Sequence, residues 1–260
     1  MSRGKNGKPG GETGGRFGSL LIFAGLIILY SLFTDVFALF NGMIFPGWRK
    51  IVPDAIKSAP LLFNGLLNSL GLLVPAVLGA FLTGMGLGVA VGLHPRAKRV
   101  LMPLFRAMNP VPSTMLIPYA IAVLPTFWLS SVAIIYVGVL WPVLMNTLHG
   151  IAMLEPRWID NARCLNLEGW RLIRKVVLPG AMPQIFAGMS AGLIRSFLLL
   201  TVAEMFGAKA GLGFFVQYYA DFAEYGRVIA GMMFLSAVVV SIMAVFDLVQ
   251  RRTLHWTKKR

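Results

Sequence analysis

The chain has 260 residues, of which 57% are hydrophobic and only 13% are charged. A water-soluble domain of this size rarely carries so few charges, and the long apolar runs indicate a membrane protein. The formal net charge is +14, but the Lys and Arg residues lie in short loops and tails that flank apolar runs, which argues against a nucleic-acid-binding face. The single cysteine, Cys164, excludes an intrachain disulfide and a cysteine metal cluster.

The N-terminal part of the chain changes from polar to apolar after residue 16. Residues 1–16 are rich in Gly, carry basic side chains and lack large apolar ones, which predicts a disordered basic tail. Residues 17–40 form an apolar run too long for a signal-peptide core, so we expect a first transmembrane helix. Residues 41–64 hold three prolines and several charges, and we expect a polar periplasmic segment with a short interfacial helix.

Five further apolar runs have the length of a transmembrane helix. They cover residues 65–93, 101–124, 127–149, 184–206 and 228–250. In the run 65–93, Gly84, Gly86 and Gly88 would allow close helix packing. Four prolines in the run 101–124 predict a broken helix. The runs together predict an all-α polytopic membrane protein with about six transmembrane helices. A Gly- and Tyr-rich loop at 207–227 and a basic tail at 251–260 complete the chain.

Charged side chains gather between the fourth and fifth spans, within residues 152–183. Each unpaired charge in hydrocarbon is costly, so this loop must lie in water, and ordered loops of this length are usually functional. An apolar stripe at Ile159, Ala162 and Leu165 predicts a first short helix. Asp160 would lie in its first turn, where a carboxylate suits the helix dipole.

A break and a second helix follow in the same loop. Asn166 and Gly169 tolerate positive φ and predict the break. The apolar residues between Trp170 and Val177 predict the second helix, which Pro179 would end. A helix–turn–helix exposed on one side of a membrane protein is suited to docking a soluble partner.

The run DNARCLNLEGWRLIRKVVLPGAMP, residues 160–183, resembles the cytoplasmic coupling motif of bacterial ATP-binding cassette (ABC) importer permeases. That motif reads Glu-Ala-Ala, then a Gly, and ends in Leu-Pro. Asp replaces Glu here, Asn replaces the first Ala, and Asn replaces the Gly, where it tolerates the left-handed conformation. The residues expected to couple the chain to an ATPase are Glu155, Asp160, Asn161, Ala162, Asn166, Leu178 and Pro179.

Three other stretches extend the resemblance to the permeases for nitrate, aliphatic sulfonates, taurine and bicarbonate. They are NPVPSTMLIP at 109–118, WPVLMNTLHGI at 141–151 and VAEMFGAKAGLGFFV at 202–216. The resemblance implies an ABC permease core at 65–250 and favours a sulfonate-, taurine- or nitrate-like anion as the solute. An Arg is expected in that subfamily at the position of Ser190, whereas this chain has Arg195 further along.

The Lys and Arg residues also predict the orientation. Four lie in the N-terminal tail, three after the second span, five in the coupling loop and five at the C-terminus, against five in the opposite set of loops. Because the basic loops stay in the cytoplasm, we expect both termini and the coupling loop to be cytoplasmic in a bacterial inner membrane.

The resemblance implies a set of partners. Two permease copies, as a homodimer or with a related chain, would form the path, and a cytoplasmic ATPase dimer would receive the two coupling helices. An extracytoplasmic binding protein would deliver the solute. The chain has no G-x-x-x-x-G-K-[ST] motif, so it is not expected to hydrolyse ATP or to be an enzyme. ATP and Mg²⁺ would be used by the partner ATPase, with no cofactor or metal on this chain.

Two charged residues lie in or near the fifth span. An intramembrane charge such as Arg195 is a functional hypothesis by default, with an anionic substrate as its natural partner. The alternative is a structural ion pair, with Glu204 as one candidate, although the two lie about 13–14 Å apart along a helix. Glu204 itself could line the path, sit at headgroup level or pair with Lys209.

The Pro-rich third span offers further candidates for the path. Asn109, Ser113 and Thr114 lie among its prolines and would present freed carbonyls and side chains to a pore, because broken helices at membrane depth need protein or water around them. A kink that serves only packing is the alternative.

Two other classes of function compete with the permease. An ion-driven secondary transporter or channel predicts intramembrane carboxylates or inverted repeats, whereas Asp35, Glu204 and Asp247 lie near span ends. A membrane-embedded enzyme needs a nucleophile–base pair or a motif such as H-E-x-x-H, which three scattered histidines do not supply. Neither class explains the amphipathic coupling loop.

Overall fold

The computed structural model describes residues 25, 28–36 and 42–258. The predicted tail at 1–16 and most of the predicted first span at 17–40 lie outside these residues. Inside them, residues 28–31 are helical and lead into the π-helix η1 (Leu32–Val36). The described part of the chain contains helices and no strand, which confirms the predicted all-α class.

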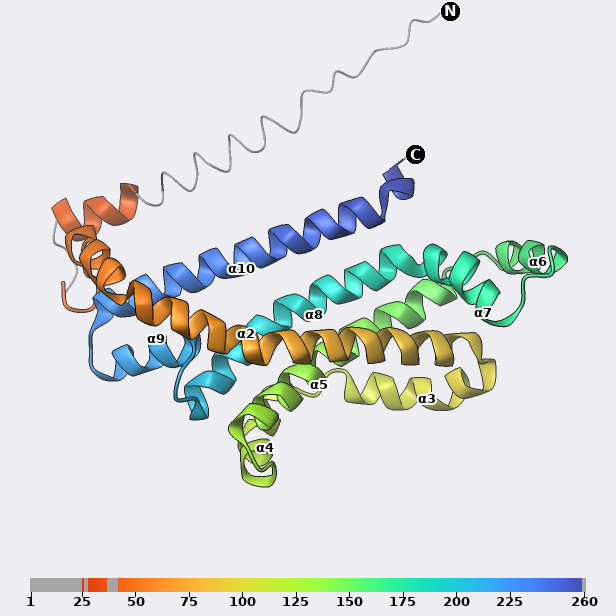
Figure 1. Cartoon of the computed structure of the whole chain (residues 1–260), viewed down its shortest axis with the longest axis horizontal. Helices are drawn as coiled ribbons and strands as arrows, with labels where there is room; N and C mark the ends of the chain where they lie inside the picture. Colours follow the sequence, from red (N-terminus) through yellow and green to blue (C-terminus); the bar gives the residue numbers. More distant parts are fainter. Residues whose placement is uncertain (1–24, 26–27, 37–41, 259–260) are drawn as a thin grey trace, which may run out of the picture.

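Four described helices are long and apolar enough to cross a membrane, and they run lengthwise through the molecule (Figure 1). They are α2 (Trp48–Leu93), α5 (Phe127–Ala152), the continuous helix 169–207 and α10 (Tyr225–Thr253). The continuous helix joins α7 (Gly169–Leu172), the π-helix η3 (Ile173–Val177) and α8 (Leu178–Gly207). Long apolar helices cover the predicted spans at 127–149, 184–206 and 228–250, and each helix extends beyond its predicted span.

Helix α2 corrects the prediction for residues 41–64. A polar segment followed by a span at 65–93 was expected, but one helix of 46 residues begins at Trp48. Pro53, Pro60 and Pro75 all lie inside it. Ile51, Ser58 and Leu62 are buried at helical spacing in its first part, so packing against the bundle offsets the cost of the prolines.

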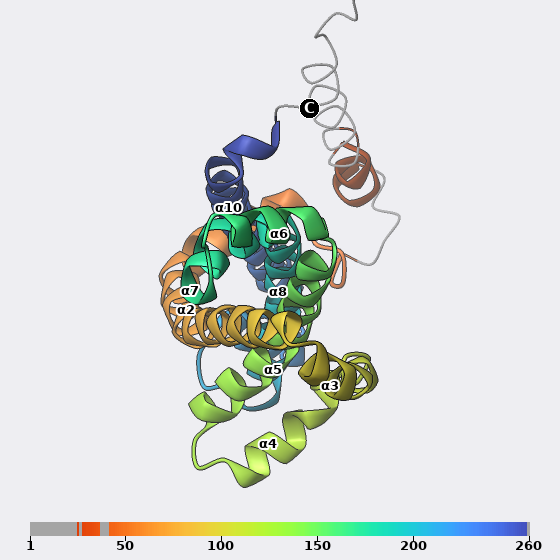
Figure 2. The same cartoon turned by 90° about the vertical axis from the view of Figure 1, so that its right-hand side faces the viewer.

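The predicted third span at 101–124 is not one helix. It is divided into α3 (Pro95–Met108), the 3-10 helix η2 (Ser113–Leu116) and α4 (Ile117–Val123). The break at 109–112 contains Pro110 and Pro112, as the proline pattern predicted. Helix α4 projects from one side of the molecule (Figures 1 and 2) but packs on α5, with Ile117 buried in the main apolar cluster.

Helix α5 lies at the centre of the packing, between α8 and α2. Its residues Ile135, Val139 and Val143 are buried in the main apolar cluster. Glycine permits the closest contact with α2, because a Cβ at Gly88 would lie 2.6 Å from the Cβ of Thr147. Gly84 meets Val143 in the same way, whereas Gly86 faces open space, so two of the three predicted close-packing glycines are confirmed.

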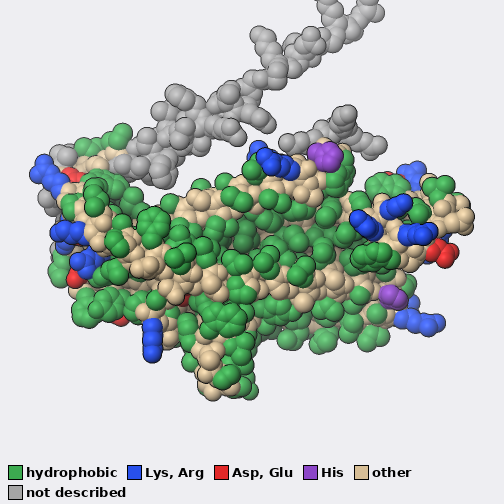
Figure 3. Space-filling model, in the orientation of Figure 1, with side chains coloured by type: hydrophobic (Ala, Val, Ile, Leu, Met, Phe, Trp, Pro, Cys, Tyr) green, Lys and Arg blue, Asp and Glu red, His purple; other side chains and the backbone are tan. Residues whose placement is uncertain are grey.

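The molecule has two different ends. One end carries α6 (Pro156–Cys164), the start of α8 and the last turns of α2, α5 and α10, and Figure 2 faces it. Many Lys and Arg side chains gather there (right side of Figure 3). The opposite end carries α9 (Leu212–Asp221), a helix inside the segment 207–227 that was predicted to be a loop. Leu212, Phe215 and Tyr219 are buried and hold α9 on the bundle. Their spacing is helical, but the many Gly and Tyr residues of the segment hid this pattern in the sequence.

Candidate functional site

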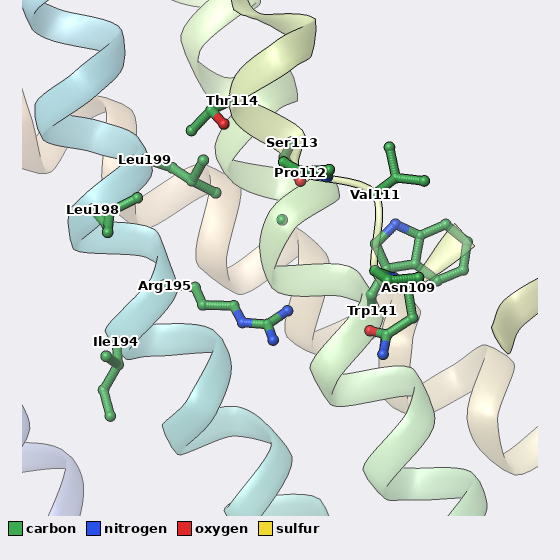
Figure 4. A pocket seen from close by; sticks show the side chains of 12 residues that line it. Asn109, Val111, Pro112, Ser113, Thr114, Trp141, Ile194, Arg195, Leu198 and Leu199 are labelled. Carbon is green, nitrogen blue, oxygen red and sulfur yellow. The ribbon is translucent and has the colours of Figure 1, made fainter. Parts of the chain in front are cut away.

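A pocket of about 390 Å³ lies where the broken helix meets α5 and α8. The break at 109–112 turns the chain, so that residues 109–114 form one wall, while Gly138 and Trp141 of α5 and Arg195 of α8 form the others (Figure 4). The structure thus brings together Asn109, Ser113, Thr114 and Arg195, four of the five residues predicted to line a path. A Cβ at Gly138 would overlap a terminal methyl group of Leu199 and lie 3.3 Å from Ser113 Oγ, so glycine lets both side chains pack over α5.

Arg195 is the one charged residue in this pocket. Its guanidinium extends from α8 toward α5 and the side where Asn109 lies (Figure 4). Among the residues that the structure describes, no carboxylate lies within 4.0 Å of it. The alternative of an Arg195–Glu204 ion pair is therefore wrong. A planar guanidinium with no carboxylate partner among these described residues is suited to holding an anion, and the Asn109 amide, the Trp141 indole and two hydroxyls supply further donors.

Glu204 lies away from this pocket, and its position differs from the one predicted. It was expected to line a path, lie at headgroup level or pair with Lys209, yet the residue is only 1% exposed. Its Oε1 accepts a hydrogen bond from Ser69 Oγ of α2 at 2.6 Å, and its Oε2 accepts one from the backbone N–H of Gly213 at 2.7 Å. The sequence did contain a sign of this buried contact, because Glu204 is an acidic residue in an apolar run. A buried carboxylate needs a polar partner in any fold.

The predicted coupling loop, residues 152–183, contains α6, whose N-cap residue is Glu155. The Glu155 carboxylate pairs with Arg157 at 2.5 Å, and Asp160 lies 3.9 Å from Arg163, both pairs on the surface. Asp160 does not lie in the first turn as predicted, because Pro156 begins the helix a turn earlier. Asp160 and Asn161 are exposed and accessible to a partner.

The predicted break in the loop is confirmed. Asn166 and Gly169 both have φ of 54°, the left-handed conformation that these two residue types tolerate. Ala162 is buried under this turn, and its carbonyl accepts from the N–H of Leu167 at 3.0 Å. A larger side chain at Ala162 would therefore disturb the turn itself.

Pro179 does not end the second helix, contrary to the prediction. Helix α7 continues through η3 into α8, and Leu178 and Pro179 are the first residues of α8. Pro lacks an N–H, and the wider π-helix that precedes it rearranges the backbone hydrogen bonds around that gap. At the next residue, Gly180 leaves room for Leu154 and Trp158, which fix α6 against the start of α8.

The outer surface of the loop combines apolar and basic side chains. Leu165 is 73% exposed and Trp170 is 71% exposed. The exposed cations around them are Arg157, Arg163, Arg171, Arg174 and Lys175. Large apolar residues exposed beside such charges are typical of surfaces that contact another protein or a membrane.

No group of three or more His, Cys, Asp or Glu residues within the described ranges could hold a metal ion. The candidate functional features are the Arg195 pocket and the predicted coupling loop. The continuous helix 169–207 joins them, because it begins inside the loop and carries Arg195.

Comparisons with known proteins converge on one family. The sequence profile of the binding-protein-dependent transport system inner membrane component matches residues 80–255. The taurine transport system permease protein TauC of Escherichia coli (strain K12) is 30% identical over 78% of this chain and 74% of its own length. The putative aliphatic sulfonates transport permease protein SsuC of Bacillus subtilis (strain 168) is 27% identical over 96% of this chain and 91% of its own.

Solved structures share the fold. The chain is similar to one from the MetNI methionine ABC transporter in an inward-facing conformation, with a TM-score of 0.64 and 17% identity, over 76% of this chain and 98% of that one. A chain of an amino acid ABC transporter with histidines gives a TM-score of 0.60 at 16% identity, over 76% of this chain and 96% of that one.

Proposed function

Because this chain belongs to the family of binding-protein-dependent transport system inner membrane components, we propose that it is the permease subunit of an ATP-driven importer that moves a small anion by alternating access. Membership confirms the resemblance drawn from the coupling motif. The family and the relatives' names make it an ABC importer permease for a small solute. The anionic substrate and the coupling residues are our proposal.

The observation that carries the proposal is the coupling loop. It combines exposed Leu165 and Trp170 with five exposed cations, and it ends in the helix that lines the Arg195 pocket. A partner that moves this loop would move the wall of the pocket, since α8 is continuous with α7. We assign the partner as a cytoplasmic ATPase dimer that uses ATP and Mg²⁺.

The Arg195 pocket supports an anionic solute. A guanidinium with no carboxylate partner among the described residues, set in a mostly apolar wall, attracts a negative group, and sulfonate accepts the bidentate hydrogen bonds that Arg offers. Two relatives transport taurine and, putatively, aliphatic sulfonates by name. We therefore place Asn109, Ser113, Thr114 and Arg195 along the path and leave Glu204 out of it.

We propose that two copies of the permease, most simply a homodimer, enclose the path, and that a binding protein delivers the solute at the end that carries α9. Both termini and the coupling loop would face the cytoplasm of a bacterial cell with the chain in its inner membrane. The concentration of Lys and Arg at the α6 end supports this orientation.

The test is affinity purification of the tagged chain in detergent, with mass spectrometry of the proteins that co-purify. Wild type should retain an ATPase subunit, and Asp160→Lys should lose it. Asp221→Lys is the matched control, because Asp221 is an exposed carboxylate at the opposite end of the molecule. Retention of the ATPase by Asp160→Lys would refute the docking assignment. A chain that purifies alone and transports without ATP would instead be an ion-driven transporter.

A further inference from the structure

A buried hydrogen-bond network joins three helices at the end of the molecule that carries α9. The Glu204 carboxylate of α8 accepts from Ser69 Oγ of α2 at 2.6 Å and from Gly213 N–H of α9 at 2.7 Å. Ser69 Oγ in turn accepts from Leu212 N–H of α9 at 3.0 Å. All three donors point toward the carboxylate, directly or through the serine.

This network satisfies the backbone at the start of α9. The first N–H groups of a helix have no partner within the helix. The first helical bond recorded across the α9 start is Phe215 N–H to Gly211 O, so Leu212 and Gly213 depend on Ser69 and Glu204. Because these groups are buried, losing a partner would leave an unsatisfied donor away from water.

The backbone around Glu204 is shaped to fit the carboxylate. Gly211 has φ of +141°, and a Cβ at this position would overlap the Glu204 carboxylate. Gly213 is equally constrained, because a Cβ there would lie 2.6 Å from the Thr201 carbonyl oxygen of α8. Gly65 of α2 lies against Gly211, where an added Cβ would be 3.2 Å from the Gly211 backbone. Three glycines thus bring α9 into direct contact with both long helices.

Glu204 also lies at the far end of the continuous helix 169–207. The helix 169–207 has 39 residues, a length of about 58 Å at 1.5 Å per residue. It begins in the coupling loop, and Glu204 lies in its last turn. One continuous helix therefore connects the proposed ATPase-docking surface to the start of α9.

We propose that Glu204 is a positioning residue that fastens α9 to the end of α8, so that movement of the coupling loop is carried to α9 at the opposite side of the membrane. This rests on the proposed function, since it needs an ATPase that moves the coupling loop. Glu204 does not touch the solute. It couples the two ends of the permease mechanically.

The first arm of the test measures the attachment alone and needs no partner. Hydrogen–deuterium exchange of the full chain in nanodiscs would compare wild type, Glu204→Gln, Ser69→Ala and Ser196→Ala. We expect exchange at residues 211–215 to be about tenfold faster in the first two variants, the factor for losing one hydrogen bond to a carboxylate. Ser196→Ala is the control, because Ser196 is equally buried on α8 but bonds only Leu193 O of its own helix. Unchanged exchange in both Glu204→Gln and Ser69→Ala would overturn the attachment.

The second arm measures transmission, with the ATPase that co-purifies with the chain. In wild type, trapping with ATP and vanadate should change exchange both in the coupling loop and at residues 211–215. In Glu204→Gln and Ser69→Ala the change in the coupling loop should persist while the change at 211–215 is lost. If both changes persist in the variants, Glu204 is only structural and the proposal is overturned. If wild type shows no change in the coupling loop, the proposed function fails instead, independently of the first arm.

Discussion

Helix α8 carries two charged residues in opposite circumstances. Arg195 faces a pocket with no carboxylate within 4.0 Å among the described residues, whereas Glu204 is buried and bonded to two other helices. An intramembrane charge is a functional hypothesis by default, and the groups around it indicate which role it has. The comparison assigns solute binding to Arg195 and contact between helices to Glu204. Substitution of Arg195 should therefore lower anion uptake, and substitution of Glu204 should lower the stability of the fold.

The largest effect should follow from removing the guanidinium. In Arg195→Ala, we expect anion uptake to fall about a hundredfold, the loss of about 3 kcal/mol for a charge-assisted hydrogen bond to a solute. The measurement is uptake of labelled taurine into proteoliposomes that contain the assembled transporter, with thermal unfolding to show that the fold is retained. Arg195→Lys, which keeps the charge without the planar fork, should lose less. If Arg195→Ala and Glu204→Ala destabilised the fold equally, the two residues could not be assigned different roles.

The next effect should fall on stability rather than on solute recognition. Glu204→Ala leaves the Gly213 N–H and the Ser69 hydroxyl without their acceptor, and we expect a loss of about 2–3 kcal/mol in the free energy of unfolding. Ser69→Ala should lose about 1 kcal/mol, and the double variant less than the sum, because the two residues share one network. Denaturant unfolding in detergent measures all three. Strict additivity would contradict the network.

A backbone variant sharpens the same comparison. Gly211→Ala places a methyl group against the Glu204 carboxylate at a φ of +141°, and we expect it to destabilise the fold by about 1–3 kcal/mol. Gly71→Ala is the control within α2, where a Cβ meets nothing within 4 Å. That change should be neutral or stabilise by about 1 kcal/mol, since Ala favours helix over Gly. A tolerated Gly211→Ala would mean that Glu204 moves away freely.

The smallest effect should come from the exposed carboxylates of the coupling loop. Asp160 lies 3.9 Å from Arg163 on the surface, and such pairs contribute little to stability. Asp160→Asn should therefore change the free energy of unfolding by less than about 0.5 kcal/mol. Denaturant unfolding in detergent measures this change. A loss comparable to that of Glu204→Ala would show that Asp160 has a structural role that its exposure does not reveal.

The sequence revealed those parts of the molecule that depend on local pattern. Apolar length predicted the helices α5, α8 and α10, and residue type predicted the left-handed turn at Asn166 and Gly169. The prolines wrongly predicted an interruption in α2 and at Pro179. Burial of Ile51 and Leu62 offsets the cost of proline in α2, and a π-helix rearranges the backbone hydrogen bonds before Pro179.

Contacts between distant residues could not be predicted in this way. The burial of Glu204 depends on Ser69, which lies 135 positions earlier in the chain. The candidate path residues could be named from composition, but their meeting in one pocket depends on the break after α3 and on how α5 packs against α8. Only tertiary packing decides which intramembrane charge finds a partner.

The most direct test of the central claim is uptake of labelled taurine by proteoliposomes that contain the permease, the ATPase that co-purifies with it and the binding protein captured alongside. We predict accumulation only when ATP is present on the side of the coupling loop, and its loss in Arg195→Ala. Uptake that proceeds without ATP, driven by an ion gradient and unaffected at Arg195, would contradict both the ATP-driven permease and the role of the pocket.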